Sequence, residues 1–142
     1  MDTSFVHVGM SVQSLDRSIA FYRDMLGMTV VWLGEFKGDQ YSAILGIPGA
    51  RGRAALLQTG GAQIELFEFA QPIPEKRRQP RSVHEYGFSH FCVRVTDIEA
   101  VYSRLKSAGV VFHCAPILFS GKNKATYGRD PDGNVFELNE GQ

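Results

Sequence analysis

Two histidines and two glutamates, all residues whose side chains bind metal ions, occur in this chain as a repeated pair: His7 with Glu65, and His90 with Glu137. Imidazole nitrogens and carboxylate oxygens together suit zinc, nickel, cobalt, manganese or iron. Two neutral imidazoles and two carboxylates also balance the charge of a divalent cation. We therefore expect His7, Glu65, His90 and Glu137 to be the ligands of one divalent metal ion.

The sequence around each of these residues is repeated as well. FVHVGMSV at 5–12 resembles FSHFCVRV at 88–95, and GAQIEL at 61–66 resembles GNVFEL at 133–138. A single histidine or glutamate on a strand is more often structural or solvated than a ligand. Four ligand-type residues in matching positions favour a metal site that arose by internal duplication.

The spacing of apolar residues indicates which way the four side chains point. Successive residues of a strand face opposite sides of the sheet, and the apolar residues next to each candidate ligand all fall on the other parity. If each half packs its apolar face against its own helix, the opposite faces can curve around a common polar cavity. The four candidates would meet in that cavity. The apolar residues are Val6, Val8, Met10, Ile64, Leu66, Phe91, Val93, Phe136 and Leu138.

Composition restricts the class of protein. The 142 residues suffice for one ordinary domain, and equal numbers of basic and acidic residues give a net charge of zero, which does not favour nucleic-acid binding. No apolar run approaches the roughly 20 residues needed to span a bilayer, and the first residues lack a secretory signal. Cys92 and Cys114 fit small reduced core residues. We expect a cytoplasmic protein with a small-molecule substrate and neither nucleic-acid nor membrane partners.

Helix and strand signals occur in the same order in both halves. The segments 14–27 and 96–109 have helical apolar spacing, with Ser14 and Thr96 as expected N-caps and glycines as stops. Three strands are expected after each helix, at 29–35, 54–58 and 63–69 in the first half and at 110–115, 125–129 and 134–139 in the second. The last turn is expected at 130–133. This order predicts an α+β fold of two paired βαβββ modules.

The modules are expected to form one domain, 1–142, with module one at about 4–69, a connector at 70–87 and module two at about 88–140. The connector contains three prolines and a basic cluster that includes Lys76, Arg77, Arg78 and Arg81. Such a cluster could attract an anionic substrate. A solvated linker is the better interpretation, because isolated charge runs are usually solvated.

The repeated motifs resemble those of the vicinal oxygen chelate superfamily, which includes glyoxalases, bleomycin-resistance proteins and extradiol dioxygenases. The likeness covers nearly the whole chain and is closest to the four-ligand glyoxalase I and methylmalonyl-CoA epimerase-like branches. It implies a cupped mixed β-sheet with helices on its outer face, a divalent metal held by His7, Glu65, His90 and Glu137, and a homodimer. The matching segments are 7–28, 64–69, 87–110 and 127–138.

A metal site of this composition predicts proton transfer next to a carbonyl group. A Lewis acid makes the adjacent C–H more acidic and offsets the negative charge that develops on oxygen. Removing the proton requires a base, and Glu137 and Glu65 are the only candidates duplicated in register. We therefore expect one of them to be the base and the other to be mainly a ligand. This chemistry fits a lyase, isomerase or epimerase.

An Fe(II) extradiol ring-cleaving dioxygenase is the alternative among enzymes. It would use His7, His90 and Glu137 as a triad of two histidines and one carboxylate, and the segment from Tyr127 resembles the terminal motif of those enzymes. The histidine expected shortly before Tyr127 is missing, since 119–126 reads FSGKNKAT. Glu65 would also have no role. This reading therefore ranks second.

A non-catalytic binding or resistance protein is the third possibility, because such a protein would use the cavity without a metal. Four retained ligand-type residues weigh against it. His84 and His113 lack duplicated partners and are interpreted as surface or packing residues, while Glu68 falls on the apolar parity and Glu140 beyond the last expected strand. Phe67 could line a pocket beside Glu65, although packing is the more probable role for it.

Overall fold

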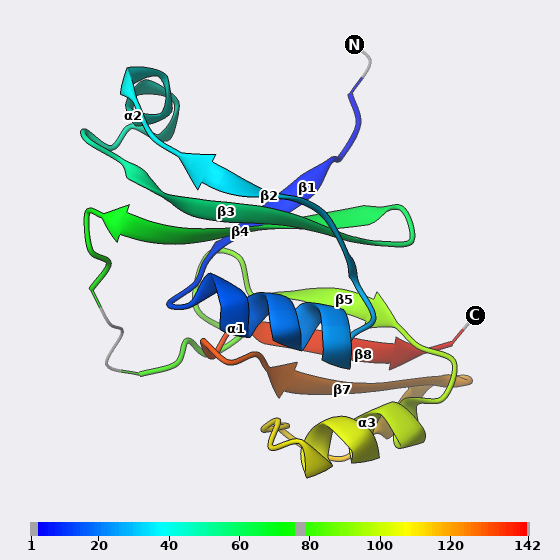
Figure 1. Cartoon of the computed structure of the whole chain (residues 1–142). Coiled ribbons are helices and arrows are strands. Elements are labelled where there is room, and N and C mark those ends of the chain that lie inside the picture. The colour runs from blue at the N-terminus through cyan, green and yellow to red at the C-terminus, as the bar shows by residue number, and fades with distance from the viewer. Residues whose placement is uncertain (1–2, 76–78, 142) are drawn as a thin grey trace. The chain divides into compact units, whose positions relative to one another are not determined.

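Two four-stranded sheets, one in each half of the chain, form the framework of the protein (Figure 1). The computed structural model describes residues 3–75 and 79–141, so Lys76, Arg77 and Arg78 of the basic cluster lie outside the described residues. The chain divides into two compact units, Met1–Lys76 and Arg77–Gln142. No helix among the described residues is long and apolar enough to cross a membrane.

The first unit has the expected strand, helix and three further strands, with one added helix. Its strands are arranged in the order β1-β4-β3-β2, with β1 and β4 parallel and the other neighbours antiparallel. The added helix, α2, was not expected from the sequence. The elements are β1 (His7–Ser11), α1 (Leu15–Ala20), the π-helical turn η1 (Phe21–Met25), β2 (Thr29–Phe36), α2 (Asp39–Leu45), β3 (Arg51–Thr59) and β4 (Ala62–Gln71).

The second unit repeats this arrangement in the order β5-β8-β7-β6, again with its first and last strands parallel. The prediction of two βαβββ modules is therefore confirmed. The expected turn at 130–133 is also present, where Asp130 accepts hydrogen bonds from the backbone of Asp132 and Asn134. The elements are β5 (His90–Arg94), α3 (Ile98–Ser107), β6 (Ile117–Ser120), β7 (Asn123–Arg129) and β8 (Val135–Glu140).

One expected strand is wrong. Residues 110–115 form only an isolated bridge between Phe112 and Gly128, and the strand follows later, at β6. The Phe112 ring packs edge-on against Tyr102 of α3 and Phe136 of β8, at 4.9 and 5.9 Å between ring centroids. The apolar residues here therefore serve packing between helix and sheet. Pro116, which has no N–H to donate to a ladder, follows the segment.

The helix ends are close to those expected. Ser14 caps α1 by accepting a hydrogen bond from the backbone N–H of Arg17 at 3.4 Å. The cap of α3 is Asp97 rather than Thr96, because the Asp97 carboxylate accepts from the N–H of Ala100 at 2.9 Å. Gly27 and Gly109 follow the helices with φ of 70° and 91°, the left-handed conformation that favours glycine.

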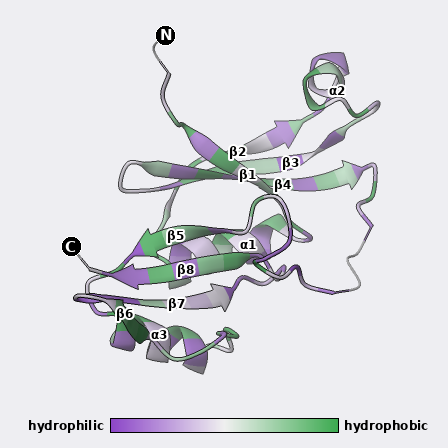
Figure 2. Cartoon of the chain, turned by 180° about the vertical axis from the view of Figure 1, so that it is seen from behind, coloured by the Kyte–Doolittle hydropathy of each residue, from purple (hydrophilic) through white to green (hydrophobic). Residues whose placement is uncertain are grey.

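Each sheet packs one face against its helix, as the apolar parity predicts. In the first unit Leu15 and Leu66 are fully buried, and α1 contacts β3 and β4. In the second unit Ile98 and Leu138 are fully buried between α3 and β8. Hydrophobic and hydrophilic residues alternate from 63 to 66 in β4. Figure 2 shows that the strands of both sheets carry residues of both kinds. The opposite parity of each sheet thus carries the candidate ligands.

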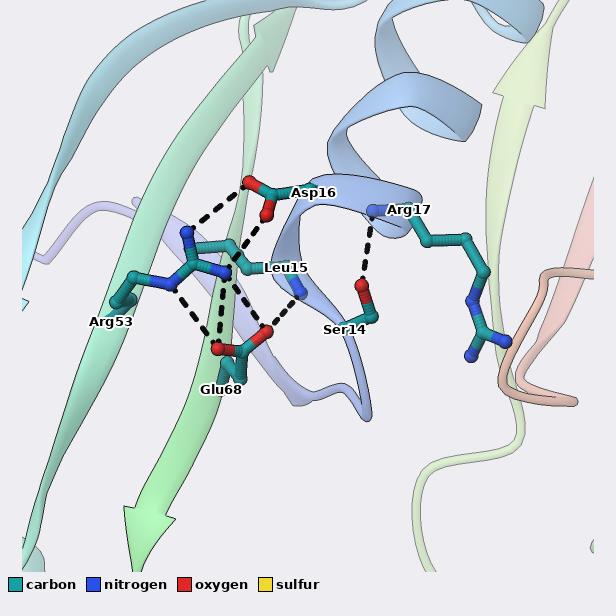
Figure 3. Close-up of polar contacts among 6 residues, drawn as sticks. All are labelled: Ser14, Leu15, Asp16, Arg17, Arg53 and Glu68. Atoms are coloured by element: carbon teal, nitrogen blue, oxygen red, sulfur yellow. Dashed lines mark hydrogen bonds and ion pairs between the residues drawn. The ribbon is translucent and has the colours of Figure 1, made fainter.

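A carboxylate on the helix side of each sheet receives the first N–H of the helix. Glu68 Oε2 accepts from the backbone of Leu15 at 2.6 Å, and the Arg53 guanidinium donates to Glu68 and to Asp16, each at 3.1 Å (Figure 3). The position of Glu68 on the apolar parity is therefore explained. It ties the start of α1 to the sheet.

The second unit contains an equivalent contact between a carboxylate of the sheet and the first N–H of the helix. Glu140 Oε2 accepts from the backbone N–H of Ile98 at 3.3 Å, and Lys124 pairs with Glu99 of α3 at 2.5 Å. Lys124 lies opposite Glu140 in the ladder, as Arg53 lies opposite Glu68. The expectation that Glu140 follows the last strand is wrong, because β8 includes it.

Replacing Glu68 by alanine should lower the free energy of unfolding by about 1–3 kcal/mol, the usual cost of leaving a buried polar group without a partner. Leu15 is fully buried and its N–H donates to this carboxylate, so the substitution removes the partner of that N–H. Urea denaturation followed by circular dichroism measures the change. Glu35→Ala is the control, since the Glu35 side chain is 71% exposed. Equal effects of the two substitutions would contradict the capping role.

Candidate metal centre

In the first unit, the parallel pairing of β1 and β4 brings His7 and Glu65 together. Glu65 pairs with Gly9, and His7 pairs with Gln63, so the two side chains share the face opposite α1. His7 Nε2 lies 3.2 Å from Glu65 Oε2, and the side chains are 40% and 26% exposed. One predicted ligand pair is thus formed and accessible to solvent.

The second unit forms the equivalent pair from β5 and β8. Glu137 pairs with Cys92, and His90 Nε2 lies 3.2 Å from Glu137 Oε2. Here the side chains are less exposed, at 27% for His90 and 15% for Glu137. The two halves therefore repeat the pair in the same register and at the same distance.

The separation of each pair fits two ligands of one ion. Ligand atoms that each lie about 2.1 Å from a metal, at right angles, are about 3.0 Å apart. Within either unit no third His, Cys, Asp or Glu among the described residues completes a metal-binding group. Each unit contributes half of the expected ligand set, and the joining of both halves at one ion stays a prediction.

Three further side chains contact the pair in the second unit. Tyr127 lies opposite Glu137 in the ladder, and its hydroxyl is 3.3 Å from His90 Nε2. Ser89 Oγ lies 2.9 Å from Nδ1 of His90, a contact that can orient the ring for metal binding through Nε2. Asn139 donates from Nδ2 to Glu137 Oε1 at 3.2 Å.

Sequence reasoning found Tyr127 only as part of a dioxygenase-like motif and missed Ser89 and Asn139. The spacing contained a usable signal for Asn139. It lies two residues after Glu137, and residues two apart in a strand share a face.

The surroundings of Glu137 shift the pKa of two neighbours. Cys92 and Cys114 are both exposed, so the expectation that they are core residues is wrong. Partial desolvation, followed by the negative charge of Glu137 and a hydrogen bond to it, raises the pKa of the Cys92 thiol to about 11. Burial and the same carboxylate also raise the pKa of Tyr127. Both groups therefore stay protonated and neutral near pH 7, so each retains a hydrogen to donate.

The first unit has an aromatic cluster in the corresponding place. Phe67 and Phe69 lie on the parity of Glu65 and pack edge-on against Phe36 of β2, with centroids 5.5 and 5.2 Å away. Tyr41 of α2 packs against the same ring. The packing interpretation of Phe67 is thus confirmed. The unexpected helix α2 completes an apolar cluster on the face that carries Glu65.

Neither remaining histidine joins a ligand pair in its unit. His84 Nδ1 lies 2.8 Å from Ser82 Oγ in the exposed connector. The His113 ring lies 6.1 Å from Tyr127 between centroids, and burial together with the positive charge of Arg129 lowers its pKa. Their interpretation as surface and packing residues agrees with these contacts.

Two βαβββ modules, each with a histidine and a glutamate on the face opposite its helix, define the class of α+β protein. Residues 4–138 match the Glyoxalase/Bleomycin resistance protein/Dioxygenase superfamily. The chain belongs to this superfamily, and the expected family resemblance is confirmed.

Similar proteins agree with this assignment. A 2-epi-5-epi-valiolone epimerase from Actinomyces is 29% identical over 71% of the chain, which spans only 56% of that protein's length. A lactoylglutathione lyase from Haemophilus influenzae is 27% identical over 95% of the chain and 90% of the lyase. The crystal structure of a glyoxalase family protein from Bacillus cereus has the same fold, with a TM-score of 0.89, 23% identity and coverage of 96% and 92% of the two chains.

Cys92 should react slowly with iodoacetamide. Raising a thiol pKa by two units, from 9.0 to about 11, lowers the reactive thiolate fraction at pH 8 by about 100-fold. Glu137→Gln removes the negative charge and should make alkylation of Cys92 severalfold faster, as measured by mass spectrometry of the peptide. The matched variant Glu65→Gln, in the other unit, should leave the rate unchanged. If Glu137→Gln had no effect, the Glu137 carboxylate would not contribute to the raised pKa of this thiol.

Proposed function

We propose that the protein is a divalent-metal-dependent enzyme of the glyoxalase type, a lyase, isomerase or epimerase that moves a proton next to a carbonyl group. One observation carries this proposal: a histidine and a glutamate approach to 3.2 Å in each module, in the same register of strands. His7, Glu65, His90 and Glu137 would hold the metal. The names of the similar proteins, a lyase and an epimerase, support the same reaction type.

The metal, when bound, supplies Lewis acidity to the substrate carbonyl. The protein residues supply the rest. His7 and His90 would bind the metal through imidazole nitrogens. The contact of Ser89 with Nδ1 can hold His90 in the orientation that leaves Nε2 available. One glutamate accepts the proton from the carbon next to the carbonyl and returns it, either to a neighbouring atom or to the other face of the same carbon.

The domain organisation, cellular location, oligomeric state and substrate class are also part of this proposal. The two modules form one domain, the protein acts as a cytoplasmic homodimer, and the substrate is a small carbonyl metabolite or thioester. Nickel, cobalt, zinc, manganese and iron all suit the ligand set.

An extradiol dioxygenase is the second candidate, favoured by the 3.3 Å contact between Tyr127 and His90. A tyrosine there can interact with an oxygen substrate held near the histidine. The candidate ranks lower because the His7–Glu65 pair is fully formed in the first unit, whereas a triad of His7, His90 and Glu137 would leave Glu65 without a role.

Metal binding is the first test. Protein purified without chelators or a metal-affinity tag should contain close to one divalent ion per chain by mass spectrometry, and His7→Ala and His90→Ala should each lower the affinity by at least tenfold. His113→Ala is the control, since His113 belongs to neither pair. A protein that is metal-free and binds no added nickel, cobalt or zinc would overturn the proposal in favour of a non-catalytic binding protein.

Proton exchange tests the reaction. In heavy water the metal-loaded protein should exchange the α-proton of a carbonyl substrate, detected by NMR while screening thiol adducts of 2-oxoaldehydes, acyl-CoA thioesters and catechols. Glu137→Gln and Glu65→Gln should each slow exchange by roughly 100-fold or more, the usual contribution of a general base or of the metal that it needs. Unchanged exchange in both variants would reject the glutamates as the base. Oxygen-dependent cleavage of a catechol would instead favour the dioxygenase.

A further inference from the structure

One row of paired residues runs across the first sheet through Glu65. Glu65 pairs with Gly9 of β1 on one side and with Leu56 of β3 on the other. Leu56 pairs in turn with Trp32 of β2. Residues that pair directly across strands present their side chains on the same face of a sheet. Trp32 therefore lies on the face that carries Glu65, two strand spacings or about 10 Å away from it.

Trp32 is a large aromatic residue that remains in contact with solvent on this face. It is 45% exposed, whereas Phe36, on the same strand and the same parity, is 1% exposed. The rings of Phe67 and Phe69 pack against Phe36 and so belong to the aromatic cluster. Those three rings stabilise the fold, while the ring of Trp32 offers an aromatic surface to a ligand.

Gly34 allows the indole ring of Trp32 to lie close to the strand. It follows Trp32 by two residues and therefore shares its face. A Cβ added at Gly34 would come within 2.6 Å of Cζ2 of Trp32, so the ring would have to move. The backbone itself does not require glycine here, because Gly34 has no positive φ. The missing side chain is thus what leaves room for the six-membered ring of the indole.

The second unit does not repeat this aromatic surface. In its row, Glu137 pairs with Cys92 and with Tyr127, both of which carry a polar group. Tyr127 has no partner in β6, because the pairing of β6 with β7 covers only residues 123–125 of β7. Polar contacts therefore predominate around Glu137, and an apolar group of a ligand is expected to bind on the first unit.

An aromatic surface beside a few polar groups is the usual composition of a small-molecule site, in which the polar groups orient the ligand. Here the His7–Glu65 pair supplies the polar groups, and Trp32 supplies the aromatic surface. We propose that Trp32 is a specificity-determining residue that stacks against a planar, apolar ring of the carbonyl substrate. Gly34 is the positioning residue that makes this placement of the indole possible. This inference rests on the proposed function.

Two hydroxamates that differ only in their apolar group test the stacking. Benzohydroxamate and acetohydroxamate chelate a metal through the same pair of neighbouring oxygens, but the first carries a phenyl ring and the second a methyl group. Calorimetry on Co²⁺-loaded protein should show tighter binding of benzohydroxamate. Trp32→Ala should weaken that binding about tenfold, because an aromatic contact and its buried surface are lost, and should change acetohydroxamate binding by less than about twofold. Trp32→Phe should restore part of the loss.

Leu33→Ala is the matched control, because Leu33 is 55% exposed on the same strand and lies on the opposite parity. Its affinity for both hydroxamates should equal that of the unmodified protein. Equal weakening of benzohydroxamate binding by Leu33→Ala and Trp32→Ala would overturn the role of the indole, as would full affinity in Trp32→Ala. A lower molecular mass of Trp32→Ala in sedimentation, with unchanged hydroxamate binding, would also overturn it, because the indole would then belong to an interface between subunits.

Gly34→Ala keeps the tryptophan and displaces its ring. Trp32 is the one tryptophan of the sequence, so the fluorescence of the free protein reports the surroundings of this indole. Gly34→Ala should shift the emission spectrum and weaken benzohydroxamate binding severalfold. Gly61→Ala is the matched control and should change neither, since a Cβ added at Gly61 meets nothing within 4 Å. An unchanged spectrum and affinity in Gly34→Ala would overturn the positioning role.

Failure of the proposed function gives a different result. An unmodified protein that binds no Co²⁺, Ni²⁺ or Zn²⁺ overturns both proposals. An unmodified protein that binds Co²⁺, and binds the two hydroxamates equally well, overturns the aromatic specificity alone. Thermal melts by circular dichroism establish that each variant compared is folded.

Discussion

The parallel pairing of the first and last strand of each module is the constraint on which the site depends. It places residues that are 58 and 47 positions apart in sequence, His7 with Glu65 and His90 with Glu137, on one face of a sheet. Because side chains alternate in a strand, a shift by one residue would turn one member of a pair toward the helix. The register is therefore as important to the site as the ligands themselves.

The helix side of each sheet helps to maintain that register. Glu68 and Glu140, three residues after Glu65 and Glu137, point to the opposite face and receive the first N–H of α1 and α3. A single strand thus contributes both a metal-type ligand and a helix anchor, separated by an odd number of residues. In both halves of the chain, one face of the sheet carries the helix anchor and the other face carries the candidate metal ligand.

Much of the fold and of the candidate site was predictable because the sequence repeats its motifs, so that each half indicates the same pattern independently. The βαβββ order followed from helix and strand signals, and the facing of the four candidate residues followed from parity. The strand at 110–115 was wrong because apolar residues such as Phe112 pack between α3 and the sheet, and alternation alone cannot distinguish that role. The helix α2 has no counterpart in the other half, so comparing the halves could not reveal it. The contact from Asn139 to Glu137 joins residues two apart in one strand, and only that spacing indicated it.

The backbone of β1 does not require a glycine at Gly9. An added Cβ would meet the Phe67 ring at an ordinary contact distance, and Gly9 has no left-handed backbone conformation that would require glycine. A small polar side chain could therefore occupy this point of β1 without moving the backbone. Gly9 and Cys92 occupy equivalent positions beside the two glutamates, so a side chain and not the backbone distinguishes the two halves at this point.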